Sequence, residues 1–398
     1  MDASQSSFIR RTSIVLLAII VFSACTTSVA APGDDVKKVI ARAESSDTDL
    51  QAKAELAVMY LLGRGVPQDT AIGVKYFREI DAWTDANQGK MGGFVPKGTG
   101  EIRFTLGNIY ASGDARVPKD LGEAEKWYRK AAELGHPGAQ FSLGIIYDYK
   151  DGVEAVKWLR KAAEQGHDMA QLYLGVHYNR GSGVAKDNAE GARWVRKAAE
   201  QGNARAMSVL SGHYYLGSGV PKDDAEGARW EKLAAESGDV SAQIEYANHL
   251  MRGYFMPKNQ VEAVKWLLRA AEGDKKYAAV IAQARLGFLY LDGYESVAKD
   301  EVQAVRWLRL AAEQGDHQSQ RGLGECYLSG TGVKQDDIEA YAWLSQAVVK
   351  TPGYSPTGDF EAGRKLAALD KSLSPQTKKL GEIRADALRQ ELAKKAGK

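Results

Sequence analysis

Apolar residues recur along most of this chain at the spacing of an amphipathic helix. In one segment, Ala170, Leu174 and Tyr178 fall at positions i, i+4 and i+8, which places them on one face of a helix. Gly181 and Gly183 then end that helix, because glycine adopts left-handed backbone angles without strain. The pattern predicts a helix with one buried face, followed by a tight glycine loop.

A second helix follows this loop in the same segment. Asp187 provides its start, and Gly202 follows its end. Trp194 and Ala198 lie on its apolar face, at the spacing of one helical turn. The segment as a whole therefore predicts a helix-turn-helix unit.

This unit repeats along the chain at a nearly fixed period. Seven of the eight tryptophans are separated by intervals of 31, 36, 36, 36, 41 and 36 residues, and Tyr76 occupies the same place in an earlier copy. A period in this range indicates a solenoid, in which each unit packs on the next. The seven residues are Trp127, Trp158, Trp194, Trp230, Trp266, Trp307 and Trp343.

Each second helix begins with the same pair of polar residues. Asp or Asn stands seven residues before the tryptophan, and Glu or Gln follows three residues later. This spacing is typical of a capping box, in which the two side chains reciprocally bind backbone amides at the start of a helix. We therefore interpret these carboxylates as structural rather than catalytic. The pairs are Asp120/Glu123, Asp151/Glu154, Asp187/Glu190, Asp223/Glu226, Asn259/Glu262, Asp300/Gln303 and Asp336/Glu339.

The motifs L-G-x-x-Y, G-x-G-V, K-D, A-x-x-W and A-A-E-x-G follow one another in most copies. Residues 172–202 carry them all, except that Gly191 replaces the alanine before the tryptophan. This pattern resembles the Sel1-like repeat, a relative of the tetratricopeptide repeat, from about Gln51 to Val349. The resemblance implies an all-α fold, a right-handed α-solenoid of about eight helix-turn-helix repeats. It also implies protein binding and scaffolding, without a catalytic residue set.

The repeats divide the chain into four segments. We expect a signal peptide over residues 1–30, an N-terminal capping helix over 31–50, the solenoid over 51–350 and C-terminal capping helices over 351–398. Residues 81–100 interrupt the solenoid with a glycine-rich insert, which predicts a long loop that is either a binding loop or disordered. The third copy lacks the glycine loop between its helices.

The first residues have the three-part layout of a secretory signal. A polar start is followed by an apolar run from Ile14 to Phe22, which is shorter than the roughly twenty residues that span a bilayer. The sequence from Phe22 to Cys25 resembles a bacterial lipobox, in which the cysteine is acylated, whereas Ser28-Val29-Ala30 would serve ordinary secretion. We favour lipidation of Cys25, which predicts a periplasmic protein anchored to the outer membrane.

Composition excludes several classes of partner and fold. Lys and Arg total 53, Asp and Glu total 51, and no basic block occurs, so the chain lacks an electrostatic footprint for nucleic acid or anionic lipid. Two cysteines, one of them in the signal, exclude a disulfide framework, and six histidines leave little material for a zinc site. We expect a monomer without a cofactor, which contacts the membrane only through its lipid anchor.

Two motifs resemble catalytic or nucleotide-binding signatures but lack their context. The G-x-G loops join two helices, whereas a nucleotide-binding loop of this kind follows a strand. Residues Ser296 to Lys299 match the S-x-x-K start of a serine hydrolase site, but no S-D-N or K-T-G partner accompanies them. A hydrolase acting on cell-wall material or β-lactams is therefore the least favoured function.

Three histidines occupy the same repeat position. His177, His213 and His249 are spaced by 36 residues and stand just before the end of the first-helix core. They are either hydrogen-bonded packing residues, or a pH-responsive stretch or partner contact, because imidazole titrates near neutral pH. Other copies have Ile109, Ile146, Leu289 and Cys326 at this position.

The resemblance to tetratricopeptide units implies that residues around the first-helix core line a concave groove. An apolar groove with a charged rim is a typical protein-docking site. Trp83, within the insert, is a second candidate anchor, because tryptophan is enriched at binding hot spots. Alternatively, these side chains pack against the neighbouring helix. Besides the three histidines, the candidate groove residues are Asn179, Arg180, Tyr215, Met251, Arg252, Phe288 and Leu291.

These patterns together predict a non-catalytic binding protein of the bacterial envelope. The favoured function is a scaffold or adaptor that docks a partner protein on a rigid curved surface. The alternative is a periplasmic immunity protein that neutralises an antibacterial effector, such as a phospholipase delivered by type VI secretion. The resemblance supports this alternative, because secreted proteins with these repeats include such inhibitors.

Overall fold

A computed structural model of the chain describes residues 34–90, 98–273, 276–348 and 359–396. Nineteen α-helices, α2 to α20, account for most of these residues, and no strand occurs among them. The chain divides into two compact units between Gln201 and Gly202. The predicted signal peptide, its Cys25 and residues 91–97 of the insert lie outside the described residues.

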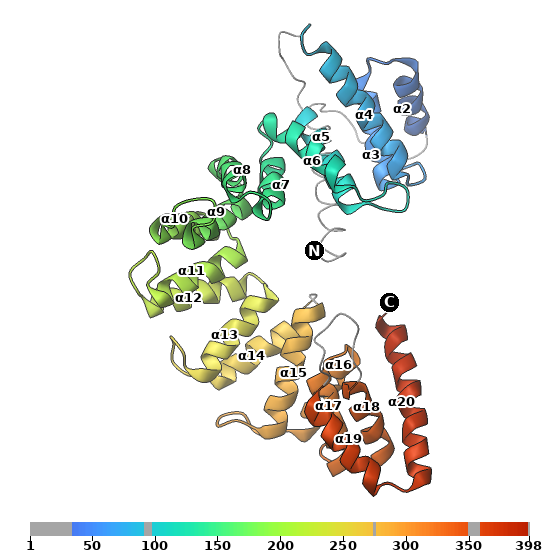
Figure 1. Ribbon diagram of the computed structural model, residues 1–398, viewed down its shortest axis with the longest axis vertical. Coiled ribbons are helices and arrows are strands. Elements are labelled where there is room, and N and C mark those ends of the chain that lie inside the picture. Colours follow the sequence, from blue (N-terminus) through green and yellow to red (C-terminus); the bar gives the residue numbers. More distant parts are fainter. Residues whose placement is uncertain (1–33, 91–97, 274–275, 349–358, 397–398) are drawn as a thin grey trace. The chain divides into compact units, whose positions relative to one another are not determined.

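The first unit is a stack of four helical hairpins preceded by one helix. The hairpins are α3–α4, α5–α6, α7–α8 and α9–α10, and each packs on the next (Figure 1). Helix α2 covers α3, where Ala43 packs with Ala52 and Leu56. The bounds are α2 (Asp34–Ser45), α3 (Leu50–Leu62), α4 (Thr70–Asn87), α5 (Thr99–Ser112), α6 (Leu121–Glu133), α7 (Pro137–Asp148), α8 (Gly152–Glu164), α9 (Asp168–Arg180) and α10 (Asn188–Glu200).

The second unit contains four further hairpins and ends in two helices that pack on α18. Ala385 and Leu388 of α20 cover Trp343 of the last hairpin. The bounds are α11 (Ala204–Leu216), α12 (Asp224–Glu236), α13 (Val240–Arg252), α14 (Gln260–Ala271), α15 (Lys276–Asp292), α16 (Glu301–Glu313), α17 (His317–Ser329), α18 (Asp337–Val348), α19 (Phe360–Ser372) and α20 (Pro375–Ala396). Eight consecutive helix pairs make an all-α solenoid, as the sequence predicts.

The predicted capping boxes form only in part. Each Asp or Asn accepts a hydrogen bond from a backbone amide of the second helix, as Asp187 does from Glu190 at 2.9 Å. The reciprocal bond is absent, because the amide of the capping residue already bonds to the first helix: Asp187 N–H donates to the Tyr178 carbonyl at 2.9 Å. Glu190 pairs instead with Arg193. The capping residue therefore closes the hairpin as well as starting the helix.

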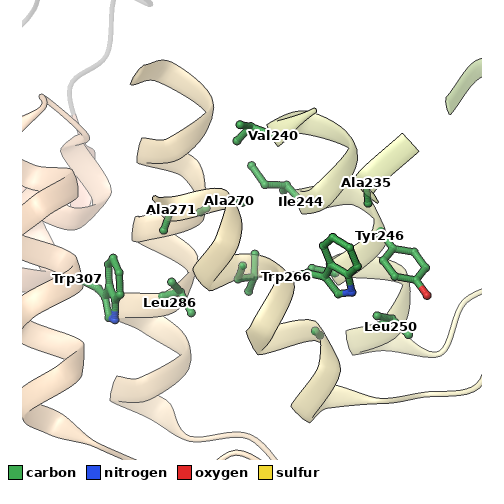
Figure 2. Close-up of a cluster of buried hydrophobic side chains, with 14 residues drawn as sticks. Ala235, Val240, Ile244, Tyr246, Leu250, Trp266, Ala270, Ala271, Leu286 and Trp307 are labelled. Atoms are coloured by element: carbon green, nitrogen blue, oxygen red, sulfur yellow. The ribbon is translucent and has the colours of Figure 1, made fainter. Parts of the chain in front are cut away.

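The core is a series of local clusters, most of them shared by neighbouring hairpins. In the second unit, Trp266 meets Tyr246 edge-on, with 5.5 Å between ring centroids. Trp307 of the next hairpin packs into the same cluster beside Leu286 (Figure 2). Of the seven repeat tryptophans, all except Trp230 are at most 9% exposed. Each hairpin therefore depends on its neighbour to bury its largest side chain.

The described part of the insert is largely helical, so the prediction of a long loop over 81–100 is wrong at both ends. Helix α4 continues to Asn87, and α5 begins at Thr99. No glycine or proline interrupts residues 81–88, so the local sequence permits α4 to continue through them. The insert therefore prolongs α4 to 18 residues, whereas α5, with 14 residues, is close in length to the other repeat helices.

Candidate functional site

Two of the three aligned histidines brace the loops that follow their own helices. His177 and His213 are both buried. Nδ1 of His177 donates to the Ser182 carbonyl at 2.8 Å, and Nδ1 of His213 donates to the Ser218 carbonyl at 2.5 Å. Their burial and bonding favour the packing interpretation over a surface contact for these two residues.

His249 makes a different contact, with a buried carboxylate. Its Nδ1 lies 2.8 Å from Oε1 and 2.9 Å from Oε2 of Glu231, and the Tyr215 hydroxyl donates to Oε2 at 2.8 Å. Glu231 is only 5% exposed and directly follows a repeat tryptophan. The other copies have an uncharged residue there: Tyr128, Leu159, Val195, Leu267, Leu308 and Leu344.

The buried carboxylate changes the titration of both neighbours. Its hydrogen bond and charge raise the pKa of His249, although burial acts in the opposite direction. Burial and the charge of Glu231 raise the pKa of Tyr215 far above its usual range, so the Tyr215 hydroxyl remains a donor. The cluster therefore holds one buried negative charge between two hydrogen-bond donors.

Phe255 covers this cluster from the loop. Its φ of 63° is the only positive φ of a non-glycine residue in the described part of the chain, and such an angle costs on the order of 1–2 kcal/mol. The Phe255 ring stacks on Tyr215 with 4.0 Å between centroids and meets His249 edge-on at 5.4 Å. Ring packing therefore offsets the backbone strain. Equivalent loops have glycine at this position: Gly65, Gly183, Gly219 and Gly332.

Tyr215 is 6% exposed and follows the alternative that the sequence left open, which is packing against a neighbouring helix. The side chain is buried between Phe255 and α12. Gly227 on α12 makes room for it, because a Cβ there would lie 2.5 Å from the Tyr215 ring. Asn179 takes the equivalent place beside Gly191 in the first unit. Glycine thus replaces the repeat alanine where a bulky or polar side chain faces it.

The remaining predicted groove residues fall into two groups. Met251, Phe288 and Leu291 are partly buried and pack against core clusters of the second unit. Arg180 and Arg252 are exposed, and the Arg252 guanidinium lies 5.8 Å from the centroid of the Tyr254 ring. The first group follows the alternative that the sequence left open, which is packing against neighbouring helices.

Several exposed apolar side chains lie at the loops of the second unit. Leu216, Tyr254, Phe255 and Tyr294 are 78%, 53%, 39% and 45% exposed, and we call these four residues the loop-edge patch. They lie where the first helices of three successive hairpins end. The loops that carry them emerge on the same side of the unit (Figure 1).

Polar contacts join two of these loops. Lys258 bonds to Glu295 at 2.6 Å, and its ammonium lies 5.5 Å from the centroid of the Tyr294 ring. The side chain of Gln260 accepts a hydrogen bond from the Ser296 amide at 2.8 Å. These contacts join the α13–α14 loop to the α15–α16 loop, so the two loops that carry Tyr254, Phe255 and Tyr294 are held next to each other.

The repeats match a known family model, described as the Sel1 repeat, in eight segments that together cover more than half of the chain. The protein belongs to the Sel1 repeat family. Each Sel1 match coincides with one helical hairpin. The matched residues are 50–79, 104–136, 137–167, 168–203, 204–239, 240–275, 280–316 and 317–348.

Two solved Sel1 structures resemble this Sel1 protein. A protective antigen present in uropathogenic Escherichia coli strains is 26% identical, with a TM-score of 0.52 over 98% of this chain and 86% of that one. A Sel1 repeat protein from Oxalobacter formigenes is 28% identical, with a TM-score of 0.62 over 87% of this chain and 96% of that one. No curated protein sequence matched significantly.

The Sel1 pattern itself contained a signal for the loop-edge patch that motif reasoning missed. Residues 252–256 read R-G-Y-F-M, where residues 180–184 read R-G-S-G-V. Glu231 likewise interrupts a position that carries no charge in the other copies. Where the chain departs from the repeat at a buried position, or at a position with a left-handed backbone, its packing differs from that of the other copies. The groove prediction instead used equivalent positions of successive copies.

Buried charges hold the end of α4 that carries Trp83, between the first two Sel1 matches. Arg103 of α5 bonds to Asp81 and Asp85, at 2.5 Å each, and Lys130 of α6 bonds to both carboxylates at 2.7 Å. Burial alone would raise the pKa of Asp85, but Lys130 and Arg103 together lower it. Trp83 itself is half-buried.

The described residues contain no helix that is both long and apolar enough to cross a membrane. Within the same residues, no group of three or more His, Cys, Asp or Glu side chains is arranged to hold a metal ion.

Proposed function

We propose that this Sel1 protein is a non-catalytic scaffold that binds a partner protein through the loop-edge patch. The observation that carries this proposal is the exposure of large apolar side chains at the loops of three successive hairpins. Aromatic residues are enriched in protein interfaces and at their hot spots. Sel1 repeat proteins generally mediate protein–protein interactions, which supports the same role here.

Crosslinking from the patch tests this role. A photoreactive phenylalanine analogue at Tyr254 or Tyr294 is expected to give a discrete adduct with one partner in the envelope of the producing cell, because these rings would lie in the interface. The same analogue at Phe360, 80% exposed on α19 of the same unit, is the matched control. Equal adducts from Phe360 and the patch, or none from the patch, would contradict the proposal.

The identity of the captured partner separates two forms of the function. A single toxin-like enzyme, inhibited in stoichiometric complex, would support an immunity protein. One or more envelope-assembly or sensor proteins would support a scaffold. Both forms use the loop-edge patch for binding. Mass spectrometry of the adduct distinguishes them because it identifies the partner protein.

We further propose that the protein acts in the envelope as a lipoprotein. The apolar run from Ile14 to Phe22 and the position of Cys25 support export and acylation. The similar Escherichia coli protein is described as a protective antigen, which supports a location accessible to antibodies. Acylation with more than one chain would keep the protein stably on the membrane.

Replacing Cys25 with Ser is expected to move the chain from the membrane pellet to the soluble envelope fraction, because a serine cannot receive the thioether-linked lipid. Fractionation followed by immunoblotting measures the shift. Cys326→Ser is the control, because this buried thiol is the other cysteine of the chain. A wild-type chain found wholly in the soluble fraction would favour cleavage after Ala30 and ordinary secretion.

A further inference from the structure

The loop that carries Phe255 is held differently from the equivalent loops after His177 and His213. In those two loops the imidazole donates to a loop carbonyl. In this loop Nδ1 of His249 is bonded to Glu231, and the loop tip rests on the Tyr215 ring through Phe255. The conformation of the exposed loop is therefore coupled to the buried cluster.

We propose that Tyr215, Glu231 and His249 form a pH-sensitive latch for the Phe255 loop. While His249 carries its proton, the imidazolium and Glu231 form a buried ion pair that keeps both rings in place beneath Phe255. When His249 loses that proton, the latch loosens and the loop leaves its strained conformation.

The cost of an uncompensated buried carboxylate drives the release. After deprotonation, Glu231 still accepts hydrogen bonds from Tyr215 and from the neutral imidazole, but it loses the cation of its ion pair. A buried charge without a counter-charge is strongly destabilising. Entry of water or movement of Glu231 would relieve this cost. Either event displaces the rings on which Phe255 packs, and the positive φ of Phe255 then has no compensating contact.

The strained backbone makes the two states of the loop close in energy. A phenylalanine at a left-handed position persists only where the surroundings impose it. Two ring contacts impose it here, at 4.0 Å from Tyr215 and 5.4 Å from His249. Both contacts involve members of the latch. Loss of the ion pair therefore acts directly on the groups that hold the loop.

The charged groups around His249 come from three helices. Glu231 of α12 contributes most to stabilising the protonated form of His249, and Glu245 of α13 stabilises it further. Arg252, also on α13, opposes protonation. Arg285 of α15 interacts with both Glu245 and Arg252, while Tyr215 of α11 stays neutral. The carboxylates dominate, so the pKa of His249 is raised.

The raised pKa of His249 sets the direction of the pH dependence. A group whose pKa is raised by folding contributes its full stabilisation below its unfolded pKa, which is about 6.5 for histidine. The contribution is lost as the pH rises through the raised value in the folded chain. The loop is therefore ordered in mildly acidic solution and loosened in alkaline solution.

Hydrogen–deuterium exchange of the full chain tests the latch. Protection of amides 253–256, corrected for the intrinsic pH dependence of exchange, is expected to fall severalfold between mildly acidic and alkaline pH, because the ion pair beneath the loop is lost. Glu231→Gln keeps the shape and removes the charge, so its loop should show no such fall. The 293–299 loop is an internal reference, because Leu289 replaces the histidine there.

Two further measurements keep the test decisive. Tyr215→Phe keeps the ring and the ion pair, so it should retain the pH dependence. Titration of the His249 Cε1 proton by NMR should give a pKa above 6.5 in the wild type. This measurement uses the wild type alone, so it does not require a variant to fold. A flat exchange profile in the wild type, an unchanged profile in Glu231→Gln, or an ordinary His249 pKa would overturn the latch.

The effect of the latch on binding rests on the proposed function of the loop-edge patch. The exchange and NMR experiments need no partner, so they can fail while crosslinking from Tyr254 succeeds. Conversely, a chain without crosslinks could still show the pH-dependent loop. If both hold, adducts from Tyr254 should decrease at alkaline pH in the wild type and remain constant in Glu231→Gln.

Discussion

Replacing Trp343 with Ala is expected to lower the free energy of unfolding by about 3–5 kcal/mol. Trp343 is 2% exposed and packs with Cys326, Ala385 and Leu388. Trp343 therefore joins the last hairpin to α20. Its replacement leaves a cavity between these helices, which are held too firmly to close it. Urea denaturation followed by circular dichroism measures the loss, and hydrogen exchange should show that α20 loses protection first.

Trp343→Phe is the matched control for this prediction. The indole Nε1 of Trp343 is buried without a hydrogen-bond partner among the described residues, as it is in the other repeat tryptophans. Phenylalanine removes that unsatisfied donor while keeping an aromatic ring. The smaller cavity and the relieved donor should limit the cost to about 1.5 kcal/mol or less. Equal destabilisation by Ala and Phe would show that packing of Trp343 does not hold α20.

The fold could be predicted from the sequence because each level of the pattern points to the same structure. Tryptophan spacing, helix-face periodicity and glycine loops all indicate paired helices. The helix starts at Asp120, Asp187 and Asp300 form as predicted, since a capping side chain acts within three residues of itself. The helical part of the insert could not be predicted in this way. Charged side chains of α5 and α6, which are distant in sequence, bond to Asp81 and stabilise the prolonged end of α4.

The candidate site could not be predicted in the same way. Resemblance assigned Tyr215 and Met251 to a groove, yet their exposure is decided by what stands opposite: Gly227 admits Tyr215, and the neighbouring core takes in Met251. The loop-edge patch arises where the chain departs from the repeat. Sequence shows the departure at Phe255, but only the three-dimensional packing shows that its ring covers Tyr215 and His249.

Replacing Arg103 with Ala is expected to cost about 3–5 kcal/mol, because it leaves Asp81 as a buried carboxylate with one cation in place of two. Arg103 and Asp81 are both almost fully buried, and Lys130 would have to balance Asp81 and Asp85 alone. The expected structural result is fraying of the last turns of α4, which carry Trp83. Chemical denaturation and hydrogen exchange of residues 81–87 measure the two effects.

Two comparisons make this prediction specific to a buried charge. Arg78→Ala removes a more exposed partner of Glu123, paired at 3.0 Å, and should cost about 1 kcal/mol or less because solvent screens the pair. The double replacement Asp81→Leu with Arg103→Met should recover most of the stability lost by Arg103→Ala, since buried ion pairs are often replaceable by apolar residues of similar volume. If Arg78→Ala and Arg103→Ala cost the same, the Asp81 carboxylate is solvated, and the prolonged end of α4 must be held by apolar contacts instead.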